Sequence, residues 1–323
     1  MKSIKKVVIA GGSGFLGSHL RQHLIEQGAE VVILTRNPDA TRSIPGQEIF
    51  WDGKTLEDWQ EQLEGADALV NLAGHTMHCR YNTSNRKKII DSRCDAVHAL
   101  GTAMTHLRTP PTVWIQISSL GIYGDTGDVL CDESAKTGQT IGRNLQLESF
   151  PADVCDAWEG AFHKYSVPGT RKVLLRNSFV LSRKESALGV LENMTRIGFG
   201  GTILPGTQYL SWIHIHDFTR LITWIIQNPN ARGTYNSVSP NPVTNREFMC
   251  LLRNQLNWRW APPIPGWAVH LGALFMYTEP SFALAGRRCV SKRLSAEGFK
   301  FNFPELTTCI NNLFSKTATQ EAE

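Results

Sequence analysis

The chain has 323 residues, of which 41% are hydrophobic and 19% charged, so it can bury a full globular core. Its formal net charge is only +4, and the lysines and arginines are scattered along the chain, which excludes a nucleic-acid partner. The seven cysteines are odd in number, widely spaced and without a C-x-x-C pair, so we expect neither a disulfide framework nor structural zinc, and a cytoplasmic location.

No secretory signal or membrane segment is predicted. The apolar run before the first glycines covers only Val7 to Ala10, which is too short for a secretory core. The apolar stretch from Trp267 to Tyr277 contains His270 and falls far short of the roughly 20 residues that a membrane-spanning helix needs. We therefore expect no membrane partner.

Residues up to about 180 alternate short runs of Val, Ile and Leu with segments of helical period. This alternation is typical of a parallel sheet covered by helices on both faces. The predicted strands are residues 6–10, 31–34, 68–72, 113–118 and 172–175, with a further strand ending near Asp52. The predicted helices are one that carries Leu16, Leu20 and Leu24 and is ended by Gly28, and two more at 85–107 and 154–165.

The sequence pattern changes after Val180, where Gly and Pro interrupt the sequence and the predicted loops between helical segments are longer. We predict a doubly wound domain over residues 1–180, to which a late strand from around 212–238 also contributes. A smaller C-terminal substrate-side domain is predicted over residues 181–323.

Two helix starts are predicted in this second part. Thr244 and Glu247 have the spacing of a capping box, which predicts a helix running to about Asn257. Asp217 is predicted to be the N-cap of an earlier helix. The neighbouring His214 and His216 are interpreted as structural.

The strongest motif is a buried strand followed by a glycine-rich turn and an amphipathic helix. The turn consists of Gly11, Gly12, Ser13, Gly14, Phe15, Leu16 and Gly17. Glycines let the backbone turn sharply and approach a pyrophosphate, while the free N–H groups at the helix N-terminus attract anionic oxygen. This order of elements predicts a Rossmann-type, doubly wound α/β fold that binds a dinucleotide.

The end of the second strand indicates which dinucleotide is bound. A protein that binds NAD usually places an acid there for the ribose 2′-hydroxyl, but this chain has Thr35-Arg36. Arg36 offers a planar cation that suits the 2′-phosphate of NADP(H), and Thr35 can add a hydroxyl hydrogen bond. The alternative is an ordinary solvated arginine. Asp52 is a candidate acceptor for the adenine amino group.

Two further strand ends carry candidate site residues. The small residues of Asn71-Leu72-Ala73-Gly74 would let the backbone pass close to the ribose of the cofactor. The segment 117–124 carries Ser118, Ser119 and Tyr123. Open α/β sheets bind their ligands at the carboxyl ends of parallel strands, so we expect these residues near the cofactor.

Taken together, these motifs resemble the extended short-chain dehydrogenases/reductases, the group that contains nucleotide-sugar epimerases and dehydratases. Within it the chain is similar to the atypical YfcH-like, or epimerase family protein, branch over nearly its full length. The motifs that carry the resemblance are GGSGFLG at 11–17, LTRNP at 34–38, NLAG at 71–74, DSR at 91–93, YGD at 123–125, AWE at 157–159, YLSWIHIHD at 209–217, KRL at 292–294 and GF at 298–299. The resemblance implies NADP(H) as cofactor and Arg93 as a further cofactor contact.

The catalytic motif usual in that superfamily is absent. Its members use Ser or Thr with Tyr-x-x-x-Lys, in which the lysine lowers the pKa of the tyrosine. None of the six tyrosines here has Lys four residues later. Alignment on Glu159 puts Cys155 at the lysine position and Pro151 at the tyrosine position. A cysteine without a cationic neighbour is usually an inert core residue.

The remaining candidates for catalysis are therefore Ser118 or Ser119, Tyr123 and His75. Only one of the two serines can face the substrate. Tyr123 without an adjacent ammonium should keep its proton at neutral pH, whereas the imidazole of His75 titrates near it. His75 is also close to His78 and Cys79 in the sequence, but three residues of mixed spacing on a loop do not predict a metal site.

Three functions remain open at this point. The first is an NADP(H)-dependent oxidoreductase or epimerase that acts on an unidentified carbonyl or secondary alcohol. The second is a catalytically silent NADP(H)-binding regulator or sensor, and the third is a structural interaction protein that keeps only the fold. A small-molecule substrate is the expected partner, and the sequence does not indicate an oligomeric state.

Overall fold

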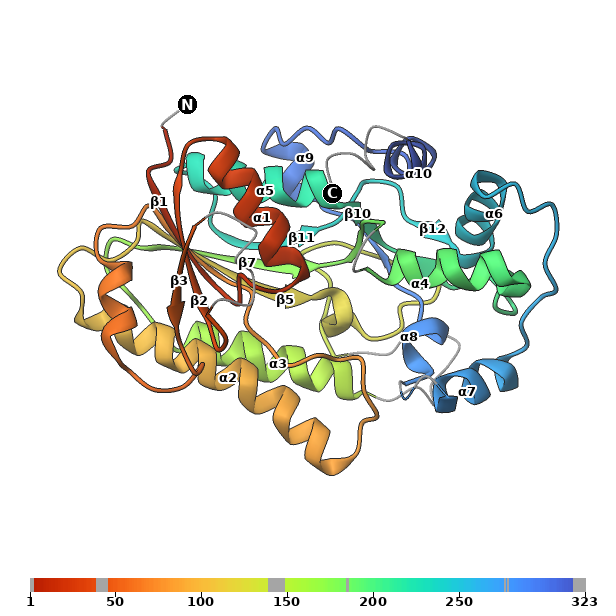
Figure 1. The fold of residues 1–323 in the computed structure, drawn as a ribbon, viewed down its shortest axis with the longest axis horizontal. Helices are drawn as coiled ribbons and strands as arrows, with labels where there is room; N and C mark the ends of the chain where they lie inside the picture. The colour runs from red at the N-terminus through yellow and green to blue at the C-terminus, as the bar shows by residue number, and fades with distance from the viewer. Residues whose placement is uncertain are drawn as a thin grey trace.

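A central parallel sheet organises the computed structural model, which describes residues 3–38, 46–138, 149–183, 186–275, 277 and 279–315. Its seven strands lie in the order β11-β7-β5-β4-β1-β2-β3 (Figure 1). They are β1 (Lys6–Ala10), β2 (Glu30–Thr35), β3 (Gln47–Phe50), β4 (Ala68–Asn71), β5 (Val113–Ser119), β7 (Arg171–Asn177) and β11 (Gly233–Ser237). The order reverses between β1 and β4, and this is the position where open α/β sheets bind ligands.

Helices cover both faces of the sheet, as the alternating pattern predicts. α1 (Phe15–Glu26) packs beside α5 (Ile215–Gln227) on one face, and α2 (Thr83–His106) packs beside α3 (Phe150–His163) on the other (Figure 1). Residues 7–10 of β1 are completely buried between the two layers. The predicted Rossmann-type doubly wound sheet is confirmed.

Element boundaries differ from the predictions mainly at their ends. β3 is an edge strand whose residues are exposed or half-buried, so it lacks the apolar run that marks the central strands. α3 begins at Phe150 instead of near Val154, because Pro151 lies in its first turn, where the fixed φ of proline favours a helix. Gly28 follows the end of α1 with a φ of 82°, as predicted.

The remaining elements are short, and most of them come after Val180. Their strands pair with one another, β8 with β10, β9 with β12 and β6 with β13. These elements are η1 (Asp58–Leu63), η2 (Leu120–Tyr123), β6 (Leu130–Cys131), β8 (Phe179–Leu181), α4 (Ala187–Met194), η3 (Thr195–Phe199), β9 (Tyr209–Leu210), β10 (Trp212–His214), β12 (Val243–Thr244), α6 (Asn245–Gln255), α7 (Gly266–Phe275), α8 (Ser281–Leu284), β13 (Arg288–Cys289), α9 (Lys292–Ala296) and α10 (Leu306–Phe314). Among the residues described, no helix is both long and apolar enough to cross a membrane.

A second hydrophobic core lies under these later elements. Trp212 is completely buried at its centre, together with Phe248 of α6 and Ile310 of α10. The capping box of α6 is formed as predicted, since Thr244 and Glu247 exchange side-chain to backbone hydrogen bonds. The late strand β11 pairs with β7 in the central sheet, so the chain returns to its first layer after building part of this second core. A separate substrate-side domain stays a prediction.

The start of α5 corrects one prediction. Its N-cap is His214, whose Nδ1 accepts a hydrogen bond of 3.0 Å from the His216 N–H. Asp217 lies inside the first turn and is completely buried. Its carboxylate accepts from the backbone N–H groups of Asn302 at 2.9 Å and Phe303 at 2.8 Å. Asp217 therefore fastens the C-terminal segment to α5.

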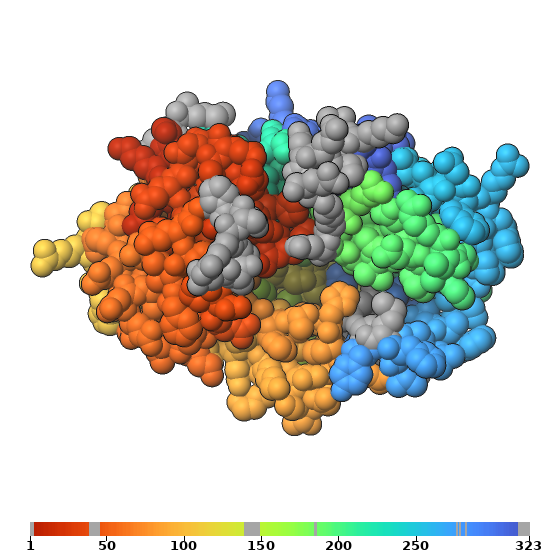
Figure 2. All heavy atoms as spheres, in the orientation of Figure 1, coloured from red at the N-terminus to blue at the C-terminus, as the bar shows by residue number. Residues whose placement is uncertain are grey.

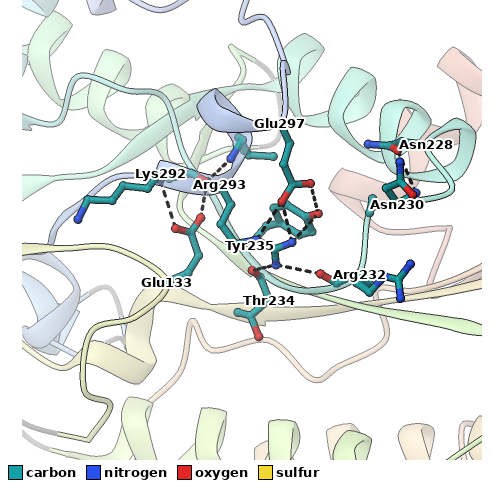
Figure 3. Close-up of polar contacts among 12 residues, drawn as sticks. Glu133, Asn228, Asn230, Arg232, Thr234, Tyr235, Lys292, Arg293 and Glu297 are labelled. Atoms are coloured by element: carbon teal, nitrogen blue, oxygen red, sulfur yellow. Dashed lines mark hydrogen bonds and ion pairs between the residues drawn. The ribbon is translucent and has the colours of Figure 1, made fainter.

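A polar network attaches α9 to β11. The guanidinium of Arg293 lies over the ring of Tyr235 at 3.9 Å and donates to Glu297, while the Tyr235 hydroxyl donates to the same carboxylate at 2.6 Å. Figure 3 shows these three side chains converging, with Glu133 beside Lys292 at the start of α9. Glu133 accepts from the backbone N–H of Lys292 at 3.2 Å. The network holds the C-terminal segment beside the main sheet.

Candidate functional site

The glycine-rich turn between β1 and α1 is tightly packed at three of its glycines. Gly11 has a φ of 75°, and a Cβ there would lie 2.8 Å from the backbone nitrogen of Ala73. A Cβ on Gly12 would meet Ile33 at 2.4 Å, and one on Gly17 would meet Gly12 at 2.4 Å. Side chains at these positions would separate β1 from β4 or α1 from the turn, so the fold itself requires glycine there.

Gly14 differs because the space beside it is open. Apart from its chain neighbours, the one atom of the described residues that lies within 4 Å of a Cβ at Gly14 is the Gly11 carbonyl oxygen at 3.6 Å, and Gly14 itself is exposed. It is the N-cap of α1, without a side-chain cap and without an acid in the first turn. The first N–H groups of α1 therefore point toward space that an anion can occupy. Phe15 and Leu16 fix this turn by packing against the main core.

Thr35 and Arg36 lie beside this turn at the end of β2. The buried Thr35 hydroxyl is 3.0 Å from the Ser13 hydroxyl, which joins the end of β2 to the glycine turn. Arg36 is exposed, and its guanidinium has no hydrogen bond or ion pair with any described residue. Asp52 forms a turn of its own by accepting from the N–H groups of Lys54 and Thr55 at 2.7 and 2.9 Å. These bonds, set against burial, lower the pKa of its carboxyl.

The segment after β4 forms the opposite wall of the glycine turn. The completely buried Asn71 accepts from the Ala73 N–H at 3.0 Å, and the Leu72 N–H donates to the Ala10 carbonyl at 2.9 Å. Gly74 is exposed, and a Cβ on it would lie 3.1 Å from Cζ of Arg93.

Arg93 of α2 holds this segment in place through a hydrogen bond to its backbone. It is buried and donates to the carbonyls of His75 and Ile89, both at 3.0 Å, and its guanidinium lies 4.9 Å from the centre of the Trp158 ring. In this position Arg93 shapes the loop that carries Ala73 and Gly74. Its expected direct contact with the cofactor stays a prediction.

Two rows of polar side chains cross the carboxyl edge of the sheet on β5, β7 and β11. One register joins Ser118, Arg176 and Asn236, and the next joins Ser119, Asn177 and Ser237. Successive residues of a strand point to opposite faces, so the two rows face in opposite directions. The two serines that the sequence left open therefore face opposite sides of the sheet.

The first row is the core of a buried network. Ser118 donates to Glu159 of α3 at 2.7 Å, and Arg176 donates to both oxygens of that carboxylate at 3.0 and 2.8 Å. Nη1 of Arg176 also donates to the Tyr123 hydroxyl at 2.8 Å. That hydroxyl lies 3.0 Å from the Asn236 Oδ1, an acceptor for its proton.

Tyr123 and Ser118, two of our candidates, therefore belong to a buried structural network, and a catalytic role for either stays a prediction. Both side chains are buried, at 1% and 2% exposure. Burial raises the pKa of Tyr123 to about 12, although the adjacent Arg176 lowers it. The two hydroxyls hold α3 and β11 against β5, and neither is accessible to a substrate.

The second row carries polar atoms that no described residue satisfies. Asn177 Oδ1 and Ser237 Oγ are buried and have no hydrogen-bond partner in the described part of the chain. Ser119 is half-buried, and its Oγ accepts from the Gly121 N–H at 3.1 Å. A hydroxyl that accepts from the backbone keeps its own hydrogen available for a ligand. This row is therefore the better candidate for contact with a substrate.

The remaining candidates lie around these rows. Cys155 is buried with its Sγ 3.7 Å from the Ser119 carbonyl oxygen, and burial together with Glu159 raises the pKa of its thiol to about 11. It is an inert core residue. His75 is half-buried, and burial, followed by the charges of Arg36, Lys88 and Arg93, lowers the pKa of its imidazole. No three His, Cys, Asp or Glu side chains of the described ranges gather as metal ligands would.

Figure 2 shows the surface hollowed between the red N-terminal segments and the green α4. The sequence analysis did not find the members of the two polar rows that come from later strands, Arg176, Asn177, Asn236 and Ser237. Their positions depend on the register between β5, β7 and β11, and the sequence contains no local signal for it. Glu159 was recognised only through the resemblance.

Comparison with known proteins agrees with this geometry. The model of the NAD dependent epimerase/dehydratase family matches residues 7–144, and a domain of unknown function (DUF1731) matches residues 264–313. The human epimerase family protein SDR39U1 is 31% identical over 95% of this chain and 99% of its own length. This chain belongs to the NAD-dependent epimerase/dehydratase family. The resemblance stated from the sequence motifs is confirmed.

Other members of the family share the full length of the chain. The epimerase family protein YfhF of Bacillus subtilis is 28% identical over 97% of this chain and 99% of its own length. A crystal structure of human SDR39U1 (isoform 2) with NADPH has a TM-score of 0.83 and 29% identity, and covers 95% of this chain and 98% of that chain. The family architecture thus extends from β1 into the C-terminal segment.

Proposed function

We propose that this family member is an NADPH-dependent oxidoreductase that acts on a carbonyl compound or a secondary alcohol. The observation that carries the proposal is the open space beside Gly14, in a turn whose other glycines are closely packed. A phosphate-sized group fits there against the N-terminus of α1, which has no acid in its first turn. The human relative SDR39U1, crystallised with NADPH, supports this choice of cofactor.

The residues of the chain fit each part of such a cofactor. The N–H groups around Gly14 and Phe15 would hold the pyrophosphate, and the unpartnered guanidinium of Arg36 would hold the 2′-phosphate. The backbone of Ala73 and Gly74 would border the ribose. When bound, NADPH supplies the hydride, so the protein must position the substrate and provide a proton.

Ser119 is the residue that would polarise the substrate oxygen. Its hydroxyl accepts from Gly121 and can donate its own hydrogen to a carbonyl at the edge of the sheet. His75 would supply the proton directly or through water, although its lowered pKa makes the protonated form scarce at neutral pH. A missing general acid costs roughly 10² to 10⁴ in rate, so we expect slow turnover.

A kinetic comparison of the two adjacent serines tests the proposal. NADPH oxidation is followed with a panel of aldehydes and ketones, and NADPH affinity is measured separately by fluorescence titration. We expect Ser119→Ala to lower kcat by about tenfold or more while NADPH affinity stays unchanged. Ser118→Ala is the matched control. We expect it to lower the free energy of unfolding and to change kcat little.

Two results would contradict the proposal. A protein that does not bind NADPH would exclude the dinucleotide site. Tight NADPH binding with no turnover of any carbonyl would instead favour the alternative, a silent NADPH-binding regulator. A cytoplasmic location is part of the proposal, and it is supported by the seven cysteines, all of which are free thiols.

A further inference from the structure

Arg287 occupies a rigid position just before β13. Its backbone N–H donates to the Tyr209 carbonyl at 2.8 Å, and its carbonyl accepts from the Ser211 hydroxyl at 2.8 Å. A Cβ on the preceding Gly286 would lie 2.8 Å from the Tyr209 nitrogen, so the two segments are in close contact. The backbone at Arg287 is therefore held in place on both sides.

The side chain of Arg287 is half-buried and has no partner among the described residues. Its Nε is buried without a hydrogen bond, and no described acid forms an ion pair with it. Two buried arginines are paired with acids, Arg21 with Glu48 at 2.7 Å and Arg176 with Glu159 at 2.8 Å, and the buried Arg93 donates to two backbone carbonyls. A partly desolvated cation without a counterion is costly unless a ligand completes it.

Arg287 lies close to the second polar row. The residue before it, Gly286, contacts the segment that follows β5 and η2: its carbonyl accepts from the Thr126 N–H at 2.9 Å, and its N–H donates to Asp125 Oδ1 at 3.3 Å. Burial raises the pKa of the Cys155 thiol, and the positive charge of Arg287 opposes that rise, while Sγ of Cys155 is 3.7 Å from the Ser119 carbonyl oxygen. These contacts bring Arg287 to the end of β5, where the proposed substrate would meet Ser119.

Two described acids come close to this segment, and neither forms an ion pair with Arg287. Asp125 Oδ1 accepts from the backbone N–H groups of Gly127 at 3.1 Å and Gly286 at 3.3 Å. The second acid is Glu279. Its carboxylate acts on the Tyr81 hydroxyl and accepts from the Tyr81 N–H at 2.7 Å. That contact holds Glu279 on the β4 loop, and it forms no ion pair with Arg287. The charge of Arg287 is therefore left for a ligand.

We propose that Arg287 is a specificity-determining residue that binds an anionic oxygen group, a carboxylate or a phosphate, carried by the carbonyl substrate. This inference rests on the proposed function and names the substrate class of the same site. The planar guanidinium can donate two parallel hydrogen bonds to either group. Ser119 would then meet the reacting oxygen while Arg287 holds the far end of the molecule.

Binding of matched probes to the NADP⁺-loaded protein tests the inference. The probes are benzaldehyde, 4-carboxybenzaldehyde and 4-formylphenyl phosphate, and their affinities are measured by calorimetric titration. We expect one anionic probe to bind at least tenfold more tightly than benzaldehyde, and Arg287→Met to remove that preference while NADP⁺ affinity stays unchanged. Which anionic probe binds more tightly distinguishes a carboxylate from a phosphate.

Arg259→Met is the matched control, because it removes an exposed arginine of the C-terminal part. It should keep the preference for the anionic probe. The inference is overturned if wild type binds neither anionic probe more tightly than benzaldehyde, or if Arg287→Met retains the preference. NADP⁺ affinity is read in the same titrations, so loss of the cofactor site is recognised separately.

Discussion

Nη1 of Arg176 donates to the Tyr123 hydroxyl at 2.8 Å, so the tyrosine nearest in sequence to the candidate serines belongs to a buried ion-pair network. The same arginine holds Glu159 of α3 through both carboxylate oxygens. In this chain the sheet edge on this face is therefore a structural clamp between β5, β7 and α3. The opposite row, which carries Ser119 and Asn177, is the one on which the proposed function rests.

The first prediction concerns this clamp. Tyr123→Phe should lower the free energy of unfolding by about 1 kcal/mol, because it removes one buried hydrogen-bonding hydroxyl. Arg176→Met should lower it by about 3–5 kcal/mol, because it leaves the Glu159 carboxylate buried and unpaired. Urea denaturation followed by circular dichroism measures both. A Tyr123→Phe protein with unchanged stability but abolished turnover would restore Tyr123 as a catalytic candidate.

The second prediction concerns the open space at Gly14. Gly14→Val should abolish detectable NADPH binding and keep the fold, because the new side chain extends into the space proposed for phosphate and meets little protein. Fluorescence titration gives the affinity, and thermal unfolding reports the fold. Gly160→Val is the control, since a Cβ at this exposed glycine of α3 also meets nothing within 4 Å. Retained NADPH binding by folded Gly14→Val would disprove the pyrophosphate site.

The third prediction concerns cofactor choice at Arg36. A charge-assisted contact with the 2′-phosphate is worth on the order of 1.5 to 3 kcal/mol, so NADPH should bind about tenfold or more tightly than NADH. Arg36→Met should remove most of this difference by weakening NADPH binding alone. Arg108→Met, which removes another exposed arginine, should leave the difference intact. Equal affinities of wild type for the two cofactors would show that Arg36 is an ordinary solvated side chain.

The predictions from the sequence were most accurate where the signal is local. The apolar run of β1 and the glycine turn after it determine their own conformation, as does the capping box of Thr244 and Glu247. The choice between Ser118 and Ser119 could not be made, because it depends on which face α3 covers. Arg287 was not recognised, because the sequence does not show which residues surround it. That its Nε lacks a hydrogen-bond partner among the described residues is known only from the fold.

The last prediction concerns His214, which is 3% exposed at the start of α5. Its Nδ1 accepts from the His216 N–H, so the ring proton lies on Nε2, which donates to Asn312 Oδ1 at 3.1 Å. Protonation of Nδ1 would break the helix cap inside a buried site. Burial, assisted by the charge of His216, accordingly lowers the pKa of His214 from 6.5 to about 3.

This lowered pKa has a defined consequence for stability. Above the unfolded pKa of 6.5 both states bind no proton at His214, and its contribution to stability is fully present. As the pH falls from there toward 3, the unfolded chain takes up a proton that the folded chain does not, so stability declines. The loss between pH 7 and pH 5 should be about 1–2 kcal/mol.

His214→Asn isolates this contribution, because Asn is a good N-cap residue that does not titrate. Urea denaturation at pH 7 and pH 5 should show a smaller loss of stability in the variant than in wild type, by about 1–2 kcal/mol. His23 also has a lowered pKa, caused first by burial, and it titrates in both proteins, so its effect cancels in the comparison. An identical loss in the two proteins would mean that His214 already binds a proton in the folded state at pH 5.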